Sequence, residues 1–545
     1  MALGSGFLRR KEISEIIAEA ESGGTGLKRV LGPGNLVLLG IGAIIGAGIF
    51  ATVGTAAVGD AARPGAGPAL VISFVLTGVA CGFAALCYAE FASMVPISGS
   101  AYTYAYTTLG ELVAWIIGWD LIIEYAVGNV AVAISWSGYF DQMMKGLGFH
   151  IPAWLTIDYR TAFQGEHVWR VVEMLKSGAG IDSITEYATA VGKVRGFLAD
   201  KVDLATIQAG VTKAHAAVAG APHLGGVPII FNLPAVLIVL AITAVLVVGI
   251  RESAAFNAVM VFIKLAVLAL FVIVGIFYID SKNYTPFAPG GWAGIRAGAA
   301  IVFFAYIGFD SVSTVAEECK NPGRDMPIGI IGSLVICTVV YIAVAAVLTG
   351  MIPLSAFTQE NKAEPLTVAL NWHKLAWISG IVAFGSVVAH TCVLLVFQLG
   401  QPRIFFSMSR DGLLPRVFAA VHPRFRTPHV TTIVTGVLVA ACAAFTNIDE
   451  MVDLTNIGTL FAFILVCAGI IILRYREPER KRPFRVPFMP WTPILGIVSC
   501  IYLATGLPGV TWWRFAVWLG VGLVIYFLYG FRKSALNNKP PRVPR

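Results

Sequence analysis

Residues 254–279 read AAFNAVMVFIKLAVLALFVIVGIFYI, an apolar stretch that contains a single charged residue, Lys264, near its middle. The stretch exceeds the roughly 20 residues that a helix needs to cross the hydrocarbon core of a bilayer. A lone ammonium group at that depth is costly, and intramembrane ionisable residues usually have a function. Lys264 is therefore predicted to take part in proton or ion coupling. The alternative is a structural cation that pairs with a neighbouring carboxylate and locks two helices together.

The whole chain has the composition of a membrane protein. Its 545 residues are 57% hydrophobic and only 13% charged, with a mean hydropathy of +0.78. The apolar runs do not alternate with polar residues, as the strands of a β-barrel would. The sequence therefore predicts an all-α integral membrane protein with about 12 transmembrane helices, at 35–61, 68–95, 111–140, 229–249, 254–279, 294–316, 326–351, 376–401, 429–446, 452–473, 491–508 and 513–531.

The distribution of lysine and arginine predicts the orientation. Short basic segments gather on one side, which the positive-inside rule makes the cytoplasmic side. They include the N-terminal tail 1–34, the loop 474–490 and the C-terminal tail 532–545. Both termini are therefore expected in the cytoplasm. The protein is expected to span the cytoplasmic membrane. This bias accounts for the net charge of +8. Contact with membrane lipids is expected, and no contact with nucleic acid.

The predicted spans and the charge distribution divide the chain into segments. Residues 35–149 are expected to hold transmembrane helices 1–3, residues 229–473 helices 4–10, and residues 491–531 helices 11–12. Between the first two groups, residues 150–228 form a charged insertion on the extracytoplasmic side. Loops of this length usually carry structure of their own, and the helical spacing of apolar residues in this insertion predicts two or three short helices that cap the outer mouth.

Two spans are predicted to be interrupted. The first contains GIGAIIGAGIF (40–50), and the sixth places Gly308 and Asp310 inside AIVFFAYIGFDSVSTVAEECKNP. These two spans are the first helices of two five-span halves. Transporters built from inverted repeats often interrupt corresponding helices of their two halves at the membrane midplane. The freed N–H groups can hold a carboxylate and the freed carbonyls an ammonium group, which are the two ends of an amino acid. The alternative is helix packing, because Gly42 and Gly46 also form a GxxxG contact motif.

Eight segments along the chain match the pattern of a known family. In order they are GIGAIIGAGIF (40–50), PGAGPALVISFVLTG (64–78), CYAEFASMVPISGSAYTYAY (87–106), GWDLIIEYAVG (118–128), FFAYIGFDSVSTVAEECKNPGRDMPIGI (303–330), RDGLLP (410–415), NIGTLFAF (456–463) and RPFRVP (482–487). On these segments the chain resembles the amino acid–polyamine–organocation superfamily, and within it the cationic amino acid transporter group with its bacterial ApcT-like permeases. The resemblance covers nearly all the spans, although the insertion is longer than the family pattern. It implies a LeuT-like 5+5 inverted repeat with broken helices 1 and 6.

The resemblance implies roles for individual residues. The substrate carboxylate would be held by backbone amides of the first break, at Gly46, Ala47 and Gly48. The substrate amino group would meet backbone carbonyls of both breaks, at Ile44, Phe304, Ala305 and Ile307. Lys264 matches the fifth-span lysine of ApcT-like members, which stands where sodium-driven relatives bind their cation and can replace sodium by gaining and losing a proton.

Acidic residues inside the spans are open to more than one interpretation. Glu124 lies past mid-depth of the third span and shares a helix face with Asp120. It is predicted to line the pocket for the substrate side chain, or else to pair with Lys264 or with a helix terminus. Asp310 follows the break in the sixth span and is expected to cap the half-helix that begins there. Three residues are expected to be interfacial anchors, namely Tyr102, Tyr104 and Tyr106.

No enzyme motif, metal-ligand spacing or cofactor motif is present in the sequence, so an enzyme is not expected and protons are the expected coupling ion. The prediction is a secondary active transporter that carries L-amino acids, small neutral or cationic, inward together with a proton. One alternative is an amino acid or polyamine exchanger in which Lys264 stays charged. Another is a membrane sensor of amino acids that uses its outer insertion. The sequence leaves a small membrane subunit open as a partner.

Overall fold

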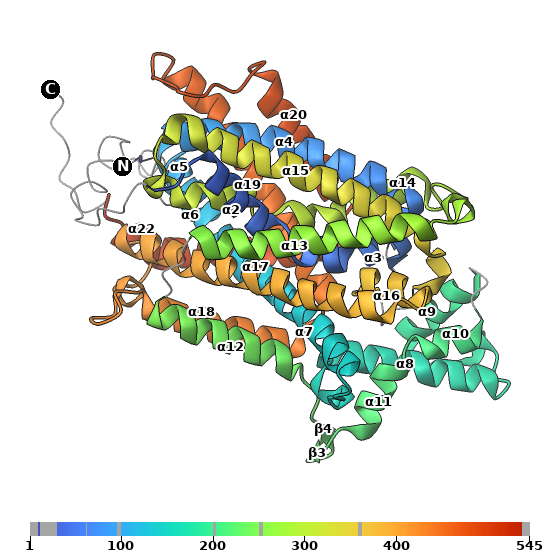
Figure 1. Ribbon diagram of the computed structural model, residues 1–545. Helices are drawn as coiled ribbons and strands as arrows, with labels where there is room; N and C mark the ends of the chain where they lie inside the picture. The colour runs from blue at the N-terminus through green and yellow to red at the C-terminus, as the bar shows by residue number, and fades with distance from the viewer. Residues whose placement is uncertain are drawn as a thin grey trace.

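The computed structural model describes residues 9–10, 30–60, 63–94, 100–199, 203–249, 254–357 and 362–536. The described chain is almost entirely helical, as Figure 1 shows. Its first part comprises α2 (Pro33–Ile44), the π-helical η2 (Gly48–Thr52), α3 (Val53–Val58), α4 (Leu70–Met94), α5 (Ser100–Thr108), α6 (Glu111–Ile122), the π-helical η4 (Ile123–Val127) and α7 (Gly128–Gly146).

The remaining helices follow after the insertion. They are α12 (Leu233–Val248), α13 (Ala254–Gly275), α14 (Gly291–Val302), the 3-10 helices η9 (Phe303–Tyr306) and η10 (Phe309–Glu318), α15 (Pro322–Met351), α16 (Pro365–Trp372), α17 (Ala376–Arg410), α18 (His429–Phe445), α19 (Ile448–Arg476), α20 (Trp491–Ala504), α21 (Gly509–Ile525), η13 (Tyr526–Gly530) and α22 (Phe531–Lys533). Short 3-10 turns and a two-residue hairpin, β1 (Gly59–Asp60) with β2 (Arg63–Pro64), connect some of them.

The all-helical membrane architecture is confirmed. Within the described residues, eight helices are long and apolar enough to cross a membrane, and nine if α2 and η2–α3, which meet at a 40° bend, form one span. Three shorter apolar helices, α12, α18 and α20, accompany them. The predicted number of about twelve is reached only when these three also cross. In the bundle, α15 packs against α4 and α2, and α17 packs against α7 and α13.

The insertion contains more structure than predicted. Instead of two or three short helices, its described residues form four α-helices, α8 (Tyr159–Lys176), α9 (Ala188–Ala199), α10 (Leu204–Ala209) and α11 (Thr212–Gly220), followed by the hairpin of β3 (His223–Leu224) and β4 (Val227–Pro228). Apolar faces of these helices pack on each other, with Val171, Val172 and Val194 in one small core. Asp158 caps α8 by accepting from the Thr161 amide, which explains why this helix begins where it does.

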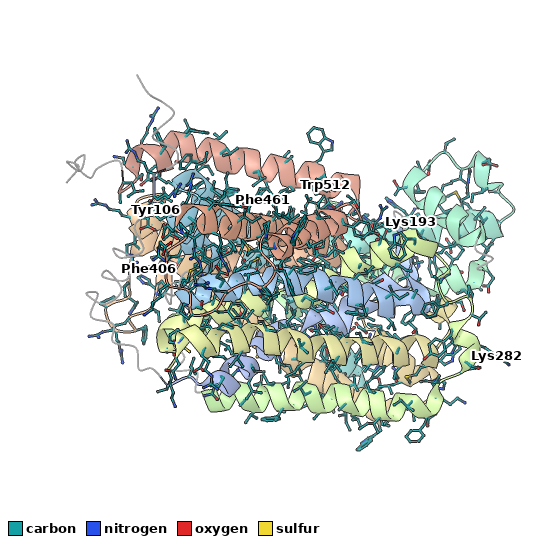
Figure 2. The ribbon with its side chains drawn as sticks, turned by 90° about the horizontal axis from the view of Figure 1, so that it is seen from above. Tyr106, Lys193, Lys282, Phe406, Phe461 and Trp512 are labelled. Carbon is teal, nitrogen blue, oxygen red and sulfur yellow. The ribbon has the colours of Figure 1, made fainter. Side chains whose placement is uncertain are left out.

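The insertion lies at one end of the helix bundle. Figure 2 places Lys193 of the insertion at that end together with Lys282, and Tyr106 and Phe406 toward the other. The Arg160 guanidinium is 2.5 Å from the Glu450 carboxylate at the start of α19, and the Asn447 side chain donates to Thr161 at 2.7 Å. The insertion therefore contacts the ends of the bundle helices directly and covers part of their surface.

One expectation about the tyrosines was wrong. The three residues predicted as interfacial anchors, Tyr102, Tyr104 and Tyr106, are each at most 2% exposed. Tyr104 stacks on Phe91 of α4, and the Tyr102 hydroxyl donates to Asp411 at 2.8 Å. Because α5 is covered by α6 and α19, its aromatic side chains pack inside the protein and do not face lipid.

Candidate functional site

The first span is interrupted between α2 and η2. The α-helix ends at Ile44, and Ile45 takes an extended conformation with φ −77° and ψ 104°. The chain resumes helical geometry near Gly48. The first N–H groups of a helix have no partner inside the helix, and among the described residues the amides of Gly46, Ala47 and Gly48 make no backbone hydrogen bond outside a helix. The predicted break is present, and its amides are placed to receive an anion.

The sixth span is interrupted between η9 and η10. Ile307 is extended, with ψ 136°, and Gly308 has φ +112°. That left-handed conformation is readily adopted only by glycine, which explains why a glycine follows FFAYI at this position. The carbonyls of Phe304, Ala305 and Ile307 lie in this turn, and all three residues are buried.

The two interruptions touch each other. A Cβ atom added to Gly48 would overlap the backbone of Ala305, so only glycine allows this approach. A Cβ atom added to Gly46 would meet the Val393 side chain of α17 at 2.6 Å, and one added to Gly42 would meet Asn257 of α13 at 2.9 Å. These glycines therefore allow close helix packing, which was the alternative interpretation of Gly42 and Gly46. The same close packing brings the first break next to the second break.

A tyrosine that sequence reasoning missed connects both breaks. The Tyr341 hydroxyl of α15 lies 2.9 Å from the Ala305 carbonyl oxygen and 3.1 Å from the Ile44 carbonyl oxygen. These are two of the four carbonyls expected to meet the substrate amino group. Each carbonyl oxygen has two lone pairs, so a bound ammonium group can share them with Tyr341. The signal in the sequence was a single aromatic residue within the predicted span 326–351.

Lys264 contacts the first break from α13. Its ammonium group donates to the carbonyl oxygens of Gly42, at 2.7 Å, and Ile45, at 2.9 Å. The residue is fully buried, and the Cys392 thiol also contacts the Gly42 carbonyl, at 3.7 Å. Within the described chain Lys264 forms no ion pair with a carboxylate. The alternative interpretation, a structural cation that pairs with a neighbouring carboxylate, is therefore not supported.

Glu124, on the π-helical turn η4 of the third span, forms no ion pair with Lys264. Its carboxyl oxygens make no hydrogen bond within 3.5 Å to a described residue, and the Thr459 side chain lies beside them. Glu124 lies next to Asp310, the residue expected to cap the second half of the sixth span. That half is instead preceded by Gly308 and has no side-chain cap, while Asp310 accepts from the Tyr125 hydroxyl at 3.2 Å. Glu124 therefore faces the broken sixth span.

His390 of α17 is fully buried. Its Nδ1 lies 2.6 Å from the Ser386 carbonyl oxygen and its Nε2 lies 2.6 Å from the Ser135 hydroxyl of α7. A carbonyl can only accept, so Nδ1 carries a proton. His390 therefore connects α17 to the neighbouring helix α7 through Ser135.

Ion pairs lie beyond the second half of the first span, at the end of the bundle that carries the insertion. Arg63, which follows α3, lies 2.6 Å from Asp60 and 2.8 Å from Asp453 of α19. Lys362 lies 3.0 Å from Asp449, which also accepts from Thr55 at 3.3 Å. These contacts connect the second half of the broken helix to α19.

A multi-pass helical protein with two broken spans that meet in its interior belongs to the class of membrane transporters. The amino acid permease family model matches residues 31–531. Because that match covers most of the chain, the protein belongs to the amino acid permease family, which the resemblance in the sequence had indicated.

Curated relatives agree with this assignment. The chain is 44% identical over 530 residues to the branched-chain amino acid permease BcaP of Bacillus subtilis, covering 97% of this chain and 99% of the relative. It is 42% identical over 535 residues to the methylthioribose transporter of the same organism, covering 98% and 100%. It is 33% identical to the vacuolar cationic amino acid transporter 4 of Arabidopsis thaliana, covering 87% and 68%. The relatives are named as transporters and permeases, and not as enzymes.

Proposed function

We propose that the protein is a secondary active transporter that carries neutral L-amino acids inward across the cytoplasmic membrane, coupled to a proton. The observation that carries the proposal is the meeting of the two breaks, where Gly48 packs against Ala305 of the FFAYI turn, next in the chain to the amides of Gly46 and Ala47. An amino acid presents one carboxylate and one ammonium group to those two elements. Both termini are proposed to lie in the cytoplasm, as the short basic segments suggest.

The surroundings of the breaks favour an apolar substrate side chain. Val393 faces Gly46, and Phe304 and Ile307 are buried in the turn of the sixth span. The carboxyl groups of Glu124 and Asp310 are buried on the third and sixth spans. Branched-chain residues fit this environment best, and the name of one relative is consistent with it. The other relative is named for methylthioribose, a sugar derivative with neither end of a zwitterion.

A substrate screen tests the proposal. Purified protein in liposomes is expected to take up labelled leucine, isoleucine and valine, more weakly alanine, and little arginine or methylthioribose. Uptake of methylthioribose without any amino acid would contradict the amino acid assignment. Binding of leucine without transport would instead support the sensor alternative.

The coupling proposal rests on Lys264. Its ammonium group ties α13 to the first break through two carbonyls and has no counter-charge among the described residues. Loss of the proton removes the charge that holds these elements together. Because a proton or a ligand shifts a conformational equilibrium only through its different affinity for the two states, such a lysine can link proton release to opening. In the exchanger alternative Lys264 stays charged, and a pH gradient drives no uptake.

Removal of the Glu124 charge is expected to change selectivity. In the variant Glu124→Gln, the ratio of arginine to leucine uptake should fall at least several-fold, because a buried carboxylate discriminates strongly by charge. The measurement is uptake of both substrates by the same proteoliposomes. The matched control is Glu450→Gln, which alters a carboxylate at the outer end of α19. An equal loss of uptake for both substrates in Glu124→Gln would show that the residue has no part in selectivity.

A further inference from the structure

A pocket outside the proposed substrate site lies between the end of α19 and the start of α20. Its volume is about 300 Å³, and it is lined by Arg474, Tyr475, Pro478, Arg482, Arg485, Met489 and Pro490. In Figure 1 the segment between α19 and α20 lies at the end of the bundle away from α8, α9 and α10. By the proposed orientation this is the cytoplasmic end.

Two of the arginines hold the walls of the pocket in place. Arg474 donates to both oxygens of the buried Glu90 of α4, at 2.8 and 2.6 Å, and the Val486 amide donates to the same carboxylate at 2.6 Å. Arg482 lies 3.2 Å from Glu90 and donates to four backbone carbonyls of the loop, those of Leu473, Glu477, Pro478 and Arg480. The loop is therefore a fixed structure around a pre-formed pocket.

The pocket carries more positive charge than its one acidic neighbour compensates. Three guanidinium groups line it, and Glu90 is the single carboxylate that pairs with them among the described residues. Burial lowers the pKa of Arg482. The nearby Glu90 carboxylate raises this pKa, and the nearby Arg474 and Arg485 lower it further. Arg485 is exposed and has no hydrogen-bond or ion-pair partner in the described chain. It is free to bind an added anion.

The rim of the pocket has the chemistry of a membrane interface. Tyr475 is 74% exposed, Phe488 83% and Trp491 66%. Tryptophan and tyrosine are enriched at the level of lipid headgroups. Trp491 begins α20, whose Leu495 and Val498 are also exposed on the outer surface of the bundle. An anion bound at the pocket would thus lie where the phosphates of the inner leaflet lie.

We propose that this pocket binds a phosphate group, and that the headgroup of an anionic phospholipid supplies it. Arginine is well suited to phosphate because its planar group donates two parallel hydrogen bonds. Basic pockets between transmembrane helices on the cytoplasmic side commonly hold such headgroups. The exposed aromatic rim favours a lipid over a soluble phosphate as the source. A bound headgroup would tie the α19–α20 loop to the leaflet and, through Glu90, to α4.

The test is native mass spectrometry of the full-length protein with added lipid. Wild-type protein is expected to retain phosphatidylglycerol in preference to phosphatidylcholine. Arg485→Gln should bind phosphatidylglycerol about fivefold more weakly, the effect of one basic residue near an anionic headgroup. The control variant Arg416→Gln, which alters an exposed arginine at the same end of the bundle, should behave as wild type. Unchanged thermal unfolding of Arg485→Gln shows that the fold is intact.

Competition separates the two sources of phosphate. Inorganic phosphate at the concentration of the lipid should not displace phosphatidylglycerol, which supports a lipid site. Complete displacement by inorganic phosphate would overturn the lipid assignment in favour of a soluble anion. Equal retention of the two lipids by wild type, or equal retention of phosphatidylglycerol by Arg485→Gln and wild type, would overturn the site itself.

Discussion

Lys264→Ala is expected to abolish accumulation of leucine driven by a pH gradient, down to the level of liposomes without protein. Binding of leucine should remain measurable, because the amides of Gly46 and Ala47 do not depend on the lysine. The physical reason is that the variant lacks the one charge that contacts the carbonyls of Gly42 and Ile45. The measurements are gradient-driven uptake and the shift in thermal unfolding caused by leucine.

Two further variants sharpen this prediction. Lys264→Arg should also fail to accumulate leucine, since arginine does not release its proton in proteins. Lys282→Ala, which removes an exposed lysine at the end of the bundle near the insertion, is the matched control and should transport as wild type. Accumulation of leucine by Lys264→Ala under a pH gradient alone would reduce Lys264 to a structural cation.

Gly48→Val is expected to abolish amino acid binding. A side chain at this position overlaps the Ala305 backbone and pushes the two breaks apart, and the valine also covers the amides of the first break. Gly46→Ala is the milder variant, because it meets only the Val393 side chain, which can move. It should weaken leucine binding without preventing folding. Binding is measured by the leucine-dependent shift in thermal unfolding.

The control for both glycine variants is Gly520→Val. Gly520 lies in α21, and a Cβ atom added to it would have no heavy atom within 4 Å, so the substitution adds the same side chain to a membrane helix at an open position. It should leave binding unchanged. Unaltered leucine affinity in folded Gly46→Ala and Gly48→Val protein would mean that these glycines only pack helices.

The fold was largely predictable from the sequence because hydrophobic length is a strong local signal. The spans at 254–279 and 376–401, for example, correspond to α13 and the first part of α17. The insertion was less predictable, because its helices are short and are stabilised by packing on each other, as Val171 packs near Val194. Periodicity alone gives neither their number nor their ends.

The site was predictable where the backbone conformation restricts the residue type, and not where tertiary contacts determine a side chain's role. The backbone at position 308 is left-handed, which favours glycine, and this glycine was visible in the sequence. In contrast, Tyr341 bridges the two breaks from a helix whose rotation the sequence does not fix. The same holds for Asp310, which bonds to Tyr125 and caps no helix, and for Tyr102, whose burial depends on where α5 folds back.

Proton movement that accompanies transport tests the central proposal most directly. Purified protein is reconstituted in liposomes that contain a pH-sensitive dye, with no gradient imposed, and leucine is added outside. We expect acidification of the liposome interior that requires leucine, is absent in Lys264→Ala, and occurs at the same rate as leucine entry. Leucine entry without any change of internal pH would contradict proton coupling and leave an exchanger or a uniporter.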